Sequence, residues 1–309
     1  MSEAHDTPGE PTQAAGAAGI PSGLVSFVGA GPGAPDLITI RGADRLRAAD
    51  IVIWASSLVP EALLAHANPE AELHDSASLT LEDVLELYTA NPDAAIVRLH
   101  SGDPSIYGAM QEQIEWCVAA GRRYEIVPGV SSLGAAAAAS GVELTVPGIS
   151  QSVVITRLAN RTSASVPPAE KLSAFAATGC TLGVFLSAAR PEALAAELLA
   201  PPSAYTPDTP AVIVVRATWP DEVLVRTTIA GLADDLRATG ATTTVLVLVG
   251  EALRERGSTG ADGEPDGPPT AGDGRSHLYS PSFAHSFRKR SKAGSTRGRP
   301  ATGRSARRR

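Results

Sequence analysis

Cysteine and aromatic residues are scarce in this chain of 309 residues, which contains two cysteines and 4% Phe, Trp and Tyr. Cys117 and Cys180 are far apart in the sequence and outside any Cys-x-x-Cys spacing. This pattern predicts neither a disulfide framework nor a structural zinc site. We expect two buried thiols in a protein of the reducing cytoplasm.

Long apolar runs are also missing. No stretch approaches the roughly 18 residues that a membrane-spanning helix needs. The first 19 residues contain three acids and neither Lys nor Arg, whereas a signal or transit peptide would carry basic residues there. We therefore expect a cytoplasmic protein that makes no contact with a membrane.

Basic charge is concentrated at the C-terminal end. Residues 275–309 hold eleven Arg or Lys and no acid, which leaves 15 basic against 33 acidic residues, a formal −18, in residues 1–274. The run "RKRSKAGSTRGRPATGRSARRR" from Arg288 is typical of a solvated, disordered tail. Any binding of nucleic acid would be confined to this tail.

The middle of the chain alternates short β-rich apolar runs with helical patterns, which predicts a mostly parallel α/β fold. Pro147 and Gly148 interrupt the periodicity, so we expect two α/β domains with a small-molecule cleft between them. The expected organisation is a disordered extension (1–22), an N-terminal α/β domain (23–146), a C-terminal α/β domain (147–253), a disordered linker (254–275) and a C-terminal segment with the basic tail (276–309).

The apolar periodicity also predicts where the individual elements lie. Strands are expected at 24–31, 51–56, 94–100, 124–129, 152–158, 180–187, 210–218, 222–229 and 243–250. Helices are expected at 37–50, 79–90, 108–121, 131–141, 168–178, 191–200 and 229–239.

Three strand-to-helix junctions of the first half combine glycine with polar residues or proline. They are "VGAGPGAPDLIT" (28–39), "RLHSGDPSIYGAM" (98–110) and "VPGVSSLGAAAA" (127–138). Singly, the first fits a tight turn or part of a nicotinamide-dinucleotide loop, and the others fit helix caps. Open α/β sheets bind ligands at the carboxyl ends of their strands, so three such junctions in one domain favour a binding site.

The three junctions resemble those of the tetrapyrrole methyltransferases. Further segments of the same family follow in the expected order: "SSLVP" (56–60), "SQSVVITRLANRT" (150–162), "VVRATWPDE" (214–222) and "SHLYSPSFAHSFR" (276–288). The resemblance covers about 24–253 and 276–288. It implies two α/β domains around a cleft, S-adenosylmethionine as methyl donor, a reduced tetrapyrrole as substrate, a homodimer and no catalytic metal.

The resemblance also implies which residues contact the cofactor, some of them through backbone atoms. Two of these positions depart from the family pattern: Leu186 stands where several relatives have Met, and Ala217 stands where several have Gly. The implied cofactor contacts are Pro32, Ser101, Gly102, Asp103, Ile106, Ser131, Ser132, Leu186, Ala217 and Thr244.

A tetrapyrrole substrate carries many carboxylates, whereas residues 1–274 are acidic, so we expect local cations in the cleft. The candidates are Arg157, Arg161 and Arg216, with Arg98 or His100 beside the second junction; a surface ion pair is the alternative for each. His100, Tyr107 and Glu112 are candidates for proton transfer on the ring, with core or surface roles as the alternative.

Overall fold

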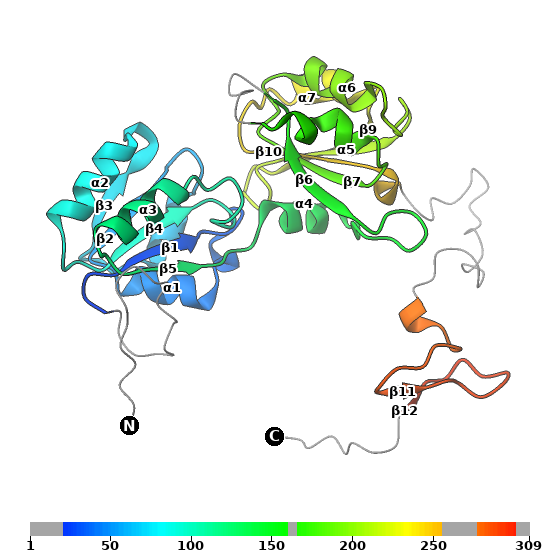
Figure 1. Cartoon of the computed structure of the whole chain (residues 1–309), viewed down its shortest axis with the longest axis horizontal. Helices are drawn as coiled ribbons and strands as arrows, with labels where there is room; N and C mark the ends of the chain where they lie inside the picture. Colours follow the sequence, from blue (N-terminus) through cyan, green and yellow to red (C-terminus); the bar gives the residue numbers. More distant parts are fainter. Residues whose placement is uncertain (1–20, 160–165, 255–276, 301–309) are drawn as a thin grey trace.

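The structure is a computed structural model that describes residues 21–159, 166–254 and 277–300. The first two ranges form two lobes, each built on a five-stranded sheet (Figure 1). No helix in these described ranges is long and apolar enough to cross a bilayer. Cys117 and Cys180 are both buried and unpaired, as predicted.

The N-terminal lobe is a parallel sheet with helices on both faces (Figure 1). Its strand order is β3-β2-β4-β1-β5, and all five residues of β1 are buried, as the apolar run there predicts. The strands are β1 (Val25–Gly29), β2 (Ile51–Trp54), β3 (Glu72–Asp75), β4 (Ile96–His100) and β5 (Tyr124–Val127). The helices are α1 (Ile40–Arg47), η2 (Glu61–His66), α2 (Leu81–Ala90) and α3 (Gln111–Ala119), with short 3-10 turns η1 (Pro35–Leu37) and η3 (Ser76–Ser78).

Edge strand β3 is the one element of this sheet that the periodicity does not predict. Its sequence ELHD has three exposed residues of four, and Leu73 is 50% exposed. An edge strand with so little buried surface has no apolar run, so its pairing with β2 is invisible in the sequence.

The second lobe is a mixed sheet in the order β6-β7-β10-β8-β9, so the prediction of a mostly parallel architecture is wrong here. β6 and β7 are parallel, whereas β10 is antiparallel to both β7 and β8, and β9 is antiparallel to β8. Short connections such as 216–222 permit antiparallel pairs without a crossover helix. The elements are β6 (Val153–Arg157), η5 (Pro168–Glu170), α5 (Leu172–Ala176), β7 (Thr181–Phe185), α6 (Pro191–Leu199), β8 (Pro210–Val215), β9 (Val223–Thr228), α7 (Leu232–Ala238), β10 (Val245–Val249) and η6 (Glu251–Leu253).

Helix α4 (Ser132–Ser140) packs against the second sheet, although the boundary predicted from the sequence places it in the first domain. Ala135 and Ala136 lie in one buried cluster with Val212 and Leu248 of the second lobe, while α5, α6 and α7 cover the opposite face. Small alanines let this helix approach the sheet closely. The domain boundary itself stays a prediction, and the packing favours a position just before Ser131.

The predicted disorder from Arg288 onward stays a prediction, and the structure describes the C-terminal segment over 277–300. It contains η7 (His277–Tyr279) and a two-stranded antiparallel ladder of β11 (Arg288–Lys289) with β12 (Arg299–Pro300). Of the segments predicted to be disordered, residues 1–20, 255–275 and 301–309 lie outside the described residues.

Candidate functional site

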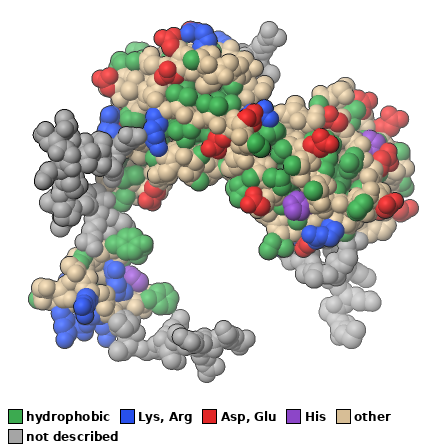
Figure 2. All heavy atoms as spheres, turned by 180° about the vertical axis from the view of Figure 1, so that it is seen from behind, with side chains coloured by type: hydrophobic (Ala, Val, Ile, Leu, Met, Phe, Trp, Pro, Cys, Tyr) green, Lys and Arg blue, Asp and Glu red, His purple; other side chains and the backbone are tan. Residues whose placement is uncertain are grey.

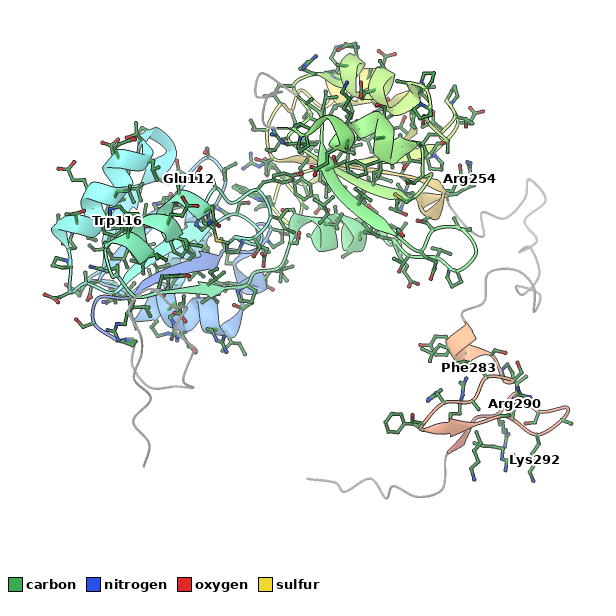
Figure 3. All side chains as sticks on the ribbon, viewed as in Figure 1. Glu112, Trp116, Arg254, Phe283, Arg290 and Lys292 are labelled. Atoms are coloured by element: carbon green, nitrogen blue, oxygen red, sulfur yellow. The ribbon has the colours of Figure 1, made fainter. Side chains whose placement is uncertain are left out.

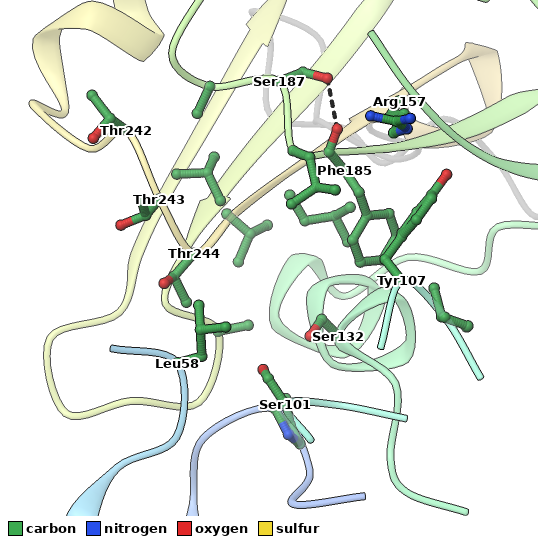
Figure 4. A pocket seen from close by; sticks show the side chains of 18 of the residues that line it. Leu58, Ser101, Tyr107, Ser132, Arg157, Phe185, Ser187, Thr242, Thr243 and Thr244 are labelled. Atoms are coloured by element: carbon green, nitrogen blue, oxygen red, sulfur yellow. Dashed lines mark hydrogen bonds between the residues drawn. The ribbon is translucent and has the colours of Figure 1, made fainter. Parts of the chain in front are cut away.

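One edge of each sheet faces a pocket of about 480 Å³ between the lobes (Figure 4). In the first lobe this edge is made by the carboxyl ends of β1, β4 and β5. In the second lobe, β6, β7 and β8 end there, and the antiparallel β10 begins there. The lining residues are Pro32, Leu58, Ser101, Ile106, Tyr107, Ser132, Arg157, Phe185, Leu186, Ser187, Ala188, Ala189, Val214, Ala217, Thr242, Thr243, Thr244, Val245 and Leu246.

Glycines hold the three junction loops of the first lobe against one another. A Cβ atom on Gly129 would lie 2.1 Å from the carbonyl oxygen of Gly102 and 2.7 Å from Cα of Gly29. Gly31 and Gly102 exchange backbone hydrogen bonds of 3.2 and 2.8 Å. Because backbone meets backbone at these points, no side chain fits. The three motifs therefore form one unit at the end of the sheet.

Asp103 ties two of these loops together and does not line the pocket. One carboxylate oxygen accepts from the backbone N–H of Ser105 at 2.9 Å, and the other accepts from the N–H of Gly129 at 2.9 Å. The sequence suggested that Asp103 begins a helix. It does not, because α3 starts at Gln111. Its carboxylate fixes backbone that carries the pocket residues Ser101 and Ile106.

The loops that meet at the pocket hold unusual backbone conformations. Tyr107, Leu186 and Thr244 line the pocket with φ of 55°, 52° and 55°. Left-handed φ is unfavourable for such side chains, and such conformations concentrate at binding sites. Within the described ranges, the other non-glycine residues with positive φ also lie in cleft loops: Ala109, Arg216 and Thr218.

Most of the residues implied as cofactor contacts lie on this one pocket. Gly102, Asp103 and Ser131 do not; Gly102 and Asp103 join the loops as described, and the Ser131 hydroxyl accepts from the N–H of Leu133 at 3.2 Å to cap α4. Those that line the pocket are Pro32, Ser101, Ile106, Ser132, Leu186, Ala217 and Thr244.

Sequence reasoning missed much of the second lobe's contribution, including Phe185, Ser187 and the stretch 242–243. In a parallel sheet the start of β10 would lie at the opposite edge. The antiparallel direction of β10 brings Thr242 and Thr243 to the pocket, and no local sequence signal reports strand direction. Leu58 lies within the quoted "SSLVP", a signal that was available.

Arg157, Arg216 and Arg161, three of the candidates for binding substrate carboxylates, have different surroundings. Arg157, at the end of β6, lines the pocket near Tyr107, whose ring packs 5.5 Å from that of Phe185 between centroids (Figure 4). Arg216 is outside the lining; it pairs with Asp221 at 3.0 Å and stacks over Trp219 at 4.2 Å. Arg161 lies outside the described residues.

Trp219 and Thr218 connect the second lobe to the glycine turn of the first. Trp219 Nε1 donates to the carbonyl oxygen of Pro32 at 3.0 Å, and Thr218 Oγ1 accepts from the N–H of Ala34 at 2.9 Å. A Cβ on Gly33 would lie 2.2 Å from Trp219 Cδ1. The glycines of this turn serve packing, which argues against a pyrophosphate-binding loop.

The three proton-transfer candidates also separate. Tyr107 lines the pocket, and partial burial raises the pKa of its hydroxyl while the charge of Arg157 opposes the shift. Glu112 is an exposed residue in the first turn of α3 (Figure 3) and does not line the pocket. His100 is 5% exposed, packs 6.0 Å from the Phe27 ring and lies outside the lining.

Burial, and then the charge of Arg98, lowers the pKa of His100 to about 3. An unfolded histidine titrates near 6.5, so between these values the unfolded state binds the extra proton and is favoured as pH falls. We expect this group alone to reduce the free energy of unfolding by about 2 kcal/mol from pH 7 to pH 5. Urea unfolding of the wild type and of His100→Gln at both pH values measures this loss of stability. The variant should lack the part of the loss that comes from His100. An equal pH dependence of the unfolding free energy in the two proteins would contradict the prediction.

The described residues contain no group of three or more His, Cys, Asp and Glu side chains placed to hold a metal ion. The fold and pocket define a two-lobed α/β protein with a pocket between its lobes. Residues 24–233 match the Tetrapyrrole (Corrin/Porphyrin) Methylases. The chain belongs to this family of methyltransferases, so the predicted family and fold are confirmed.

Similar proteins agree in sequence and in structure. A cobalt-precorrin-4 C(11)-methyltransferase of Priestia megaterium is 41% identical, covering 85% of this chain and 96% of the relative. A precorrin-4 C(11)-methyltransferase of Rhodococcus erythropolis is 44% identical, covering 75% and 93%. The structure of a cobalt precorrin-4 methyltransferase matches with a TM-score of 0.72 at 41% identity, covering 76% of this chain and 99% of the other.

A more distant solved structure shows a bound ligand. Uroporphyrin-III C-methyltransferase of Thermus thermophilus, complexed with S-adenosylhomocysteine, matches with a TM-score of 0.62 at 30% identity. The match covers 75% of this chain and 99% of the other.

Proposed function

We propose that this protein transfers a methyl group from S-adenosylmethionine to C11 of precorrin-4, giving precorrin-5 and S-adenosylhomocysteine in cobalamin biosynthesis. One observation carries the proposal. Seven residues implied as cofactor contacts line a single pocket, in a chain more than 40% identical to methyltransferases named for this carbon. The sequence segments quoted above also resemble precorrin-4 C11-methyltransferases in particular.

The pocket suits the cofactor in size and in chemistry. Its volume of about 480 Å³ falls in the range of small-ligand sites, and most of its lining is apolar. Ile106, Leu186 and Ala217 offer apolar surface, while Ser101 and Thr244 add hydroxyls and the backbone atoms of their loops. These residues would hold the cofactor and exclude water.

Bound S-adenosylmethionine supplies a methyl group that is already activated by its sulfonium. The chain therefore needs to place a ring carbon in line with that group, an effect that can lower a barrier by roughly 7–11 kcal/mol. Fixed loops serve this purpose: the glycine contacts and the Asp103 bridge hold the first lobe's wall of the pocket, and Trp219 fastens the second lobe to it.

Arg157, Tyr107 and Phe185 are the proposed substrate side of the pocket. Arg157 would pair with a ring carboxylate, since guanidinium groups bind carboxylates in a bidentate manner. The Tyr107–Phe185 pair would support the flat ring by apolar contact. Arg161 and Arg216 remain weaker candidates for the same task, and His100 and Glu112 have no proposed role on substrate.

The proposal is tested by incubating the purified protein with precorrin-4 and methyl-labelled S-adenosylmethionine. We expect a product with one added methyl group, and carbon NMR should place the label at C11. If no methylated tetrapyrrole forms, or if the label is at another carbon, the assignment is refuted. Cobalt-precorrin-4 is assayed in parallel, because relatives carry both names. A cytoplasmic location and a homodimer remain predictions.

The alternative function is that of a nicotinamide-dependent oxidoreductase, and calorimetry distinguishes it from a methyltransferase. We expect S-adenosylhomocysteine to bind and NADH not to bind, because the N–H of Gly31 is already bonded to Gly102 and offers no donor to a pyrophosphate. Binding of NADH alone would reverse the conclusion.

A further inference from the structure

The C-terminal segment 277–300, called here the basic segment, has a small fold of its own. The guanidinium of Arg288 is its centre: Nη2 donates to the carbonyl oxygens of Leu278, Ser280 and Phe283. This folds the stretch before β11 back onto the strand. Arg288 is partly buried and is therefore a structural residue of the segment.

The other Lys and Arg side chains of the basic segment are exposed to solvent. Lys289, Arg290, Lys292, Arg297 and Arg299 are exposed, and the segment contains no acid. Figure 2 shows the blue Lys and Arg side chains gathered there, and Figure 3 labels Arg290 and Lys292. A surface with this concentration of positive charge attracts anions.

Aromatic rings accompany these cations. Phe283, His285 and Phe287 stand at alternate positions, with neighbouring ring centroids 6.1 and 6.3 Å apart. Phe287 is 69% exposed, so its ring is accessible to a ligand. Rings beside cations fit a flat ligand whose edge carries negative charges.

The cleft itself has little positive charge for such a ligand. Among the described residues, Arg157 is the only Lys or Arg that lines the pocket, and residues 1–274 carry a formal −18. An acidic body repels a polycarboxylate, whereas the basic segment attracts it.

We infer that the basic segment is a second binding site, which collects the polycarboxylate tetrapyrrole for the cleft. This inference rests on the proposed function for the identity of the ligand. The 22 residues between Arg254 and His277 can span at most about 75 Å, whereas Arg254 is nine residues along the chain from Val245 of the pocket lining and so at most about 31 Å from it. A tethered site of this kind raises the local concentration of substrate without taking part in methyl transfer.

The test neutralises exposed cations and keeps the fold of the segment. The full-length triple variant Arg290→Gln, Lys292→Gln and Arg297→Gln retains Arg288. Binding is measured by fluorescence titration with uroporphyrin, a stable polycarboxylate tetrapyrrole, at low and high salt. We expect the wild type to bind about tenfold more tightly than the variant at low salt and to lose this advantage at high salt.

Kinetics separate collection of substrate from catalysis. The triple variant should raise KM for precorrin-4 several-fold and leave kcat unchanged. A matched control removes three cations from the lobes, Arg47→Gln, Arg123→Gln and Arg237→Gln, none of which lines the pocket. If the effect of the triple variant comes from the charge of the basic segment and not from the net charge of the protein, the control should leave KM and uroporphyrin affinity within about twofold of the wild type.

Each outcome decides the inference. Equal uroporphyrin affinity and equal KM in wild type and triple variant would overturn it while leaving the methyltransferase assignment intact. A single-stranded RNA that binds the segment and displaces uroporphyrin at far lower concentration would overturn it in favour of a nucleic-acid surface. If no methyl transfer is detected at all, the proposed function fails, and the uroporphyrin titration still reports on the segment by itself.

Discussion

Replacing Gly129 by alanine should reduce methyl transfer at least about 100-fold, because a displacement near 1 Å at the reacting groups has an effect of that size. The new Cβ would lie 2.1 Å from the carbonyl oxygen of Gly102 and 2.7 Å from Cα of Gly29, and both are backbone atoms that cannot rotate away. The junction loops must therefore separate. S-adenosylhomocysteine affinity by calorimetry and turnover by product mass measure the effect, and overpacking should also lower the free energy of unfolding by about 1–3 kcal/mol.

Gly134→Ala is the matched control for this substitution. Gly134 lies in α4, only five residues along the chain, is exposed, and has no heavy atom within 4 Å of a built Cβ. Alanine there should stabilise the helix by about 0.5–1 kcal/mol and leave activity unchanged. If Gly129→Ala bound S-adenosylhomocysteine as tightly as Gly134→Ala does, the close approach of the loops would not matter for the site.

Buried apolar runs made most of the fold predictable. Strands such as β1 and β10, whose residues are all buried, are found where the sequence places them. The errors concern information that is not local. Strand direction in the second sheet depends on pairing between distant segments, and the packing partner of α4 depends on which sheet presents a matching surface.

The site was predictable where a junction motif marks the end of a buried strand. Ser101, Ile106 and Ser132 are of this kind, and all three line the pocket. The role of an individual polar group was harder to predict, because an acid after a strand can cap, bridge or bind with the same residue types around it. For Asp103 the hydrogen bond that decides between these roles comes from Gly129, which is 26 residues away.

Asp103→Ala should weaken S-adenosylhomocysteine binding about tenfold or more, although Asp103 does not line the pocket. The substitution removes both carboxylate acceptors, and the N–H of Gly129 loses its partner in a partly buried position. An orphaned donor of this kind costs about 1–3 kcal/mol of stability. The loops that carry Ser101 and Ser132 lose their connection, so affinity should fall together with stability. Calorimetry with S-adenosylhomocysteine and urea unfolding are performed on the same preparations.

Asp83→Ala provides the comparison. Asp83 accepts from the N–H and the hydroxyl of Thr80 at 2.8 Å each and completes the capping box of α2, away from the pocket. Its loss should lower stability and leave S-adenosylhomocysteine affinity unchanged. If Asp103→Ala behaved in the same way, the carboxylate would contribute to stability alone. A fall in affinity for Asp103→Ala but not for Asp83→Ala would show that a bridge between two loops shapes a pocket that it does not touch.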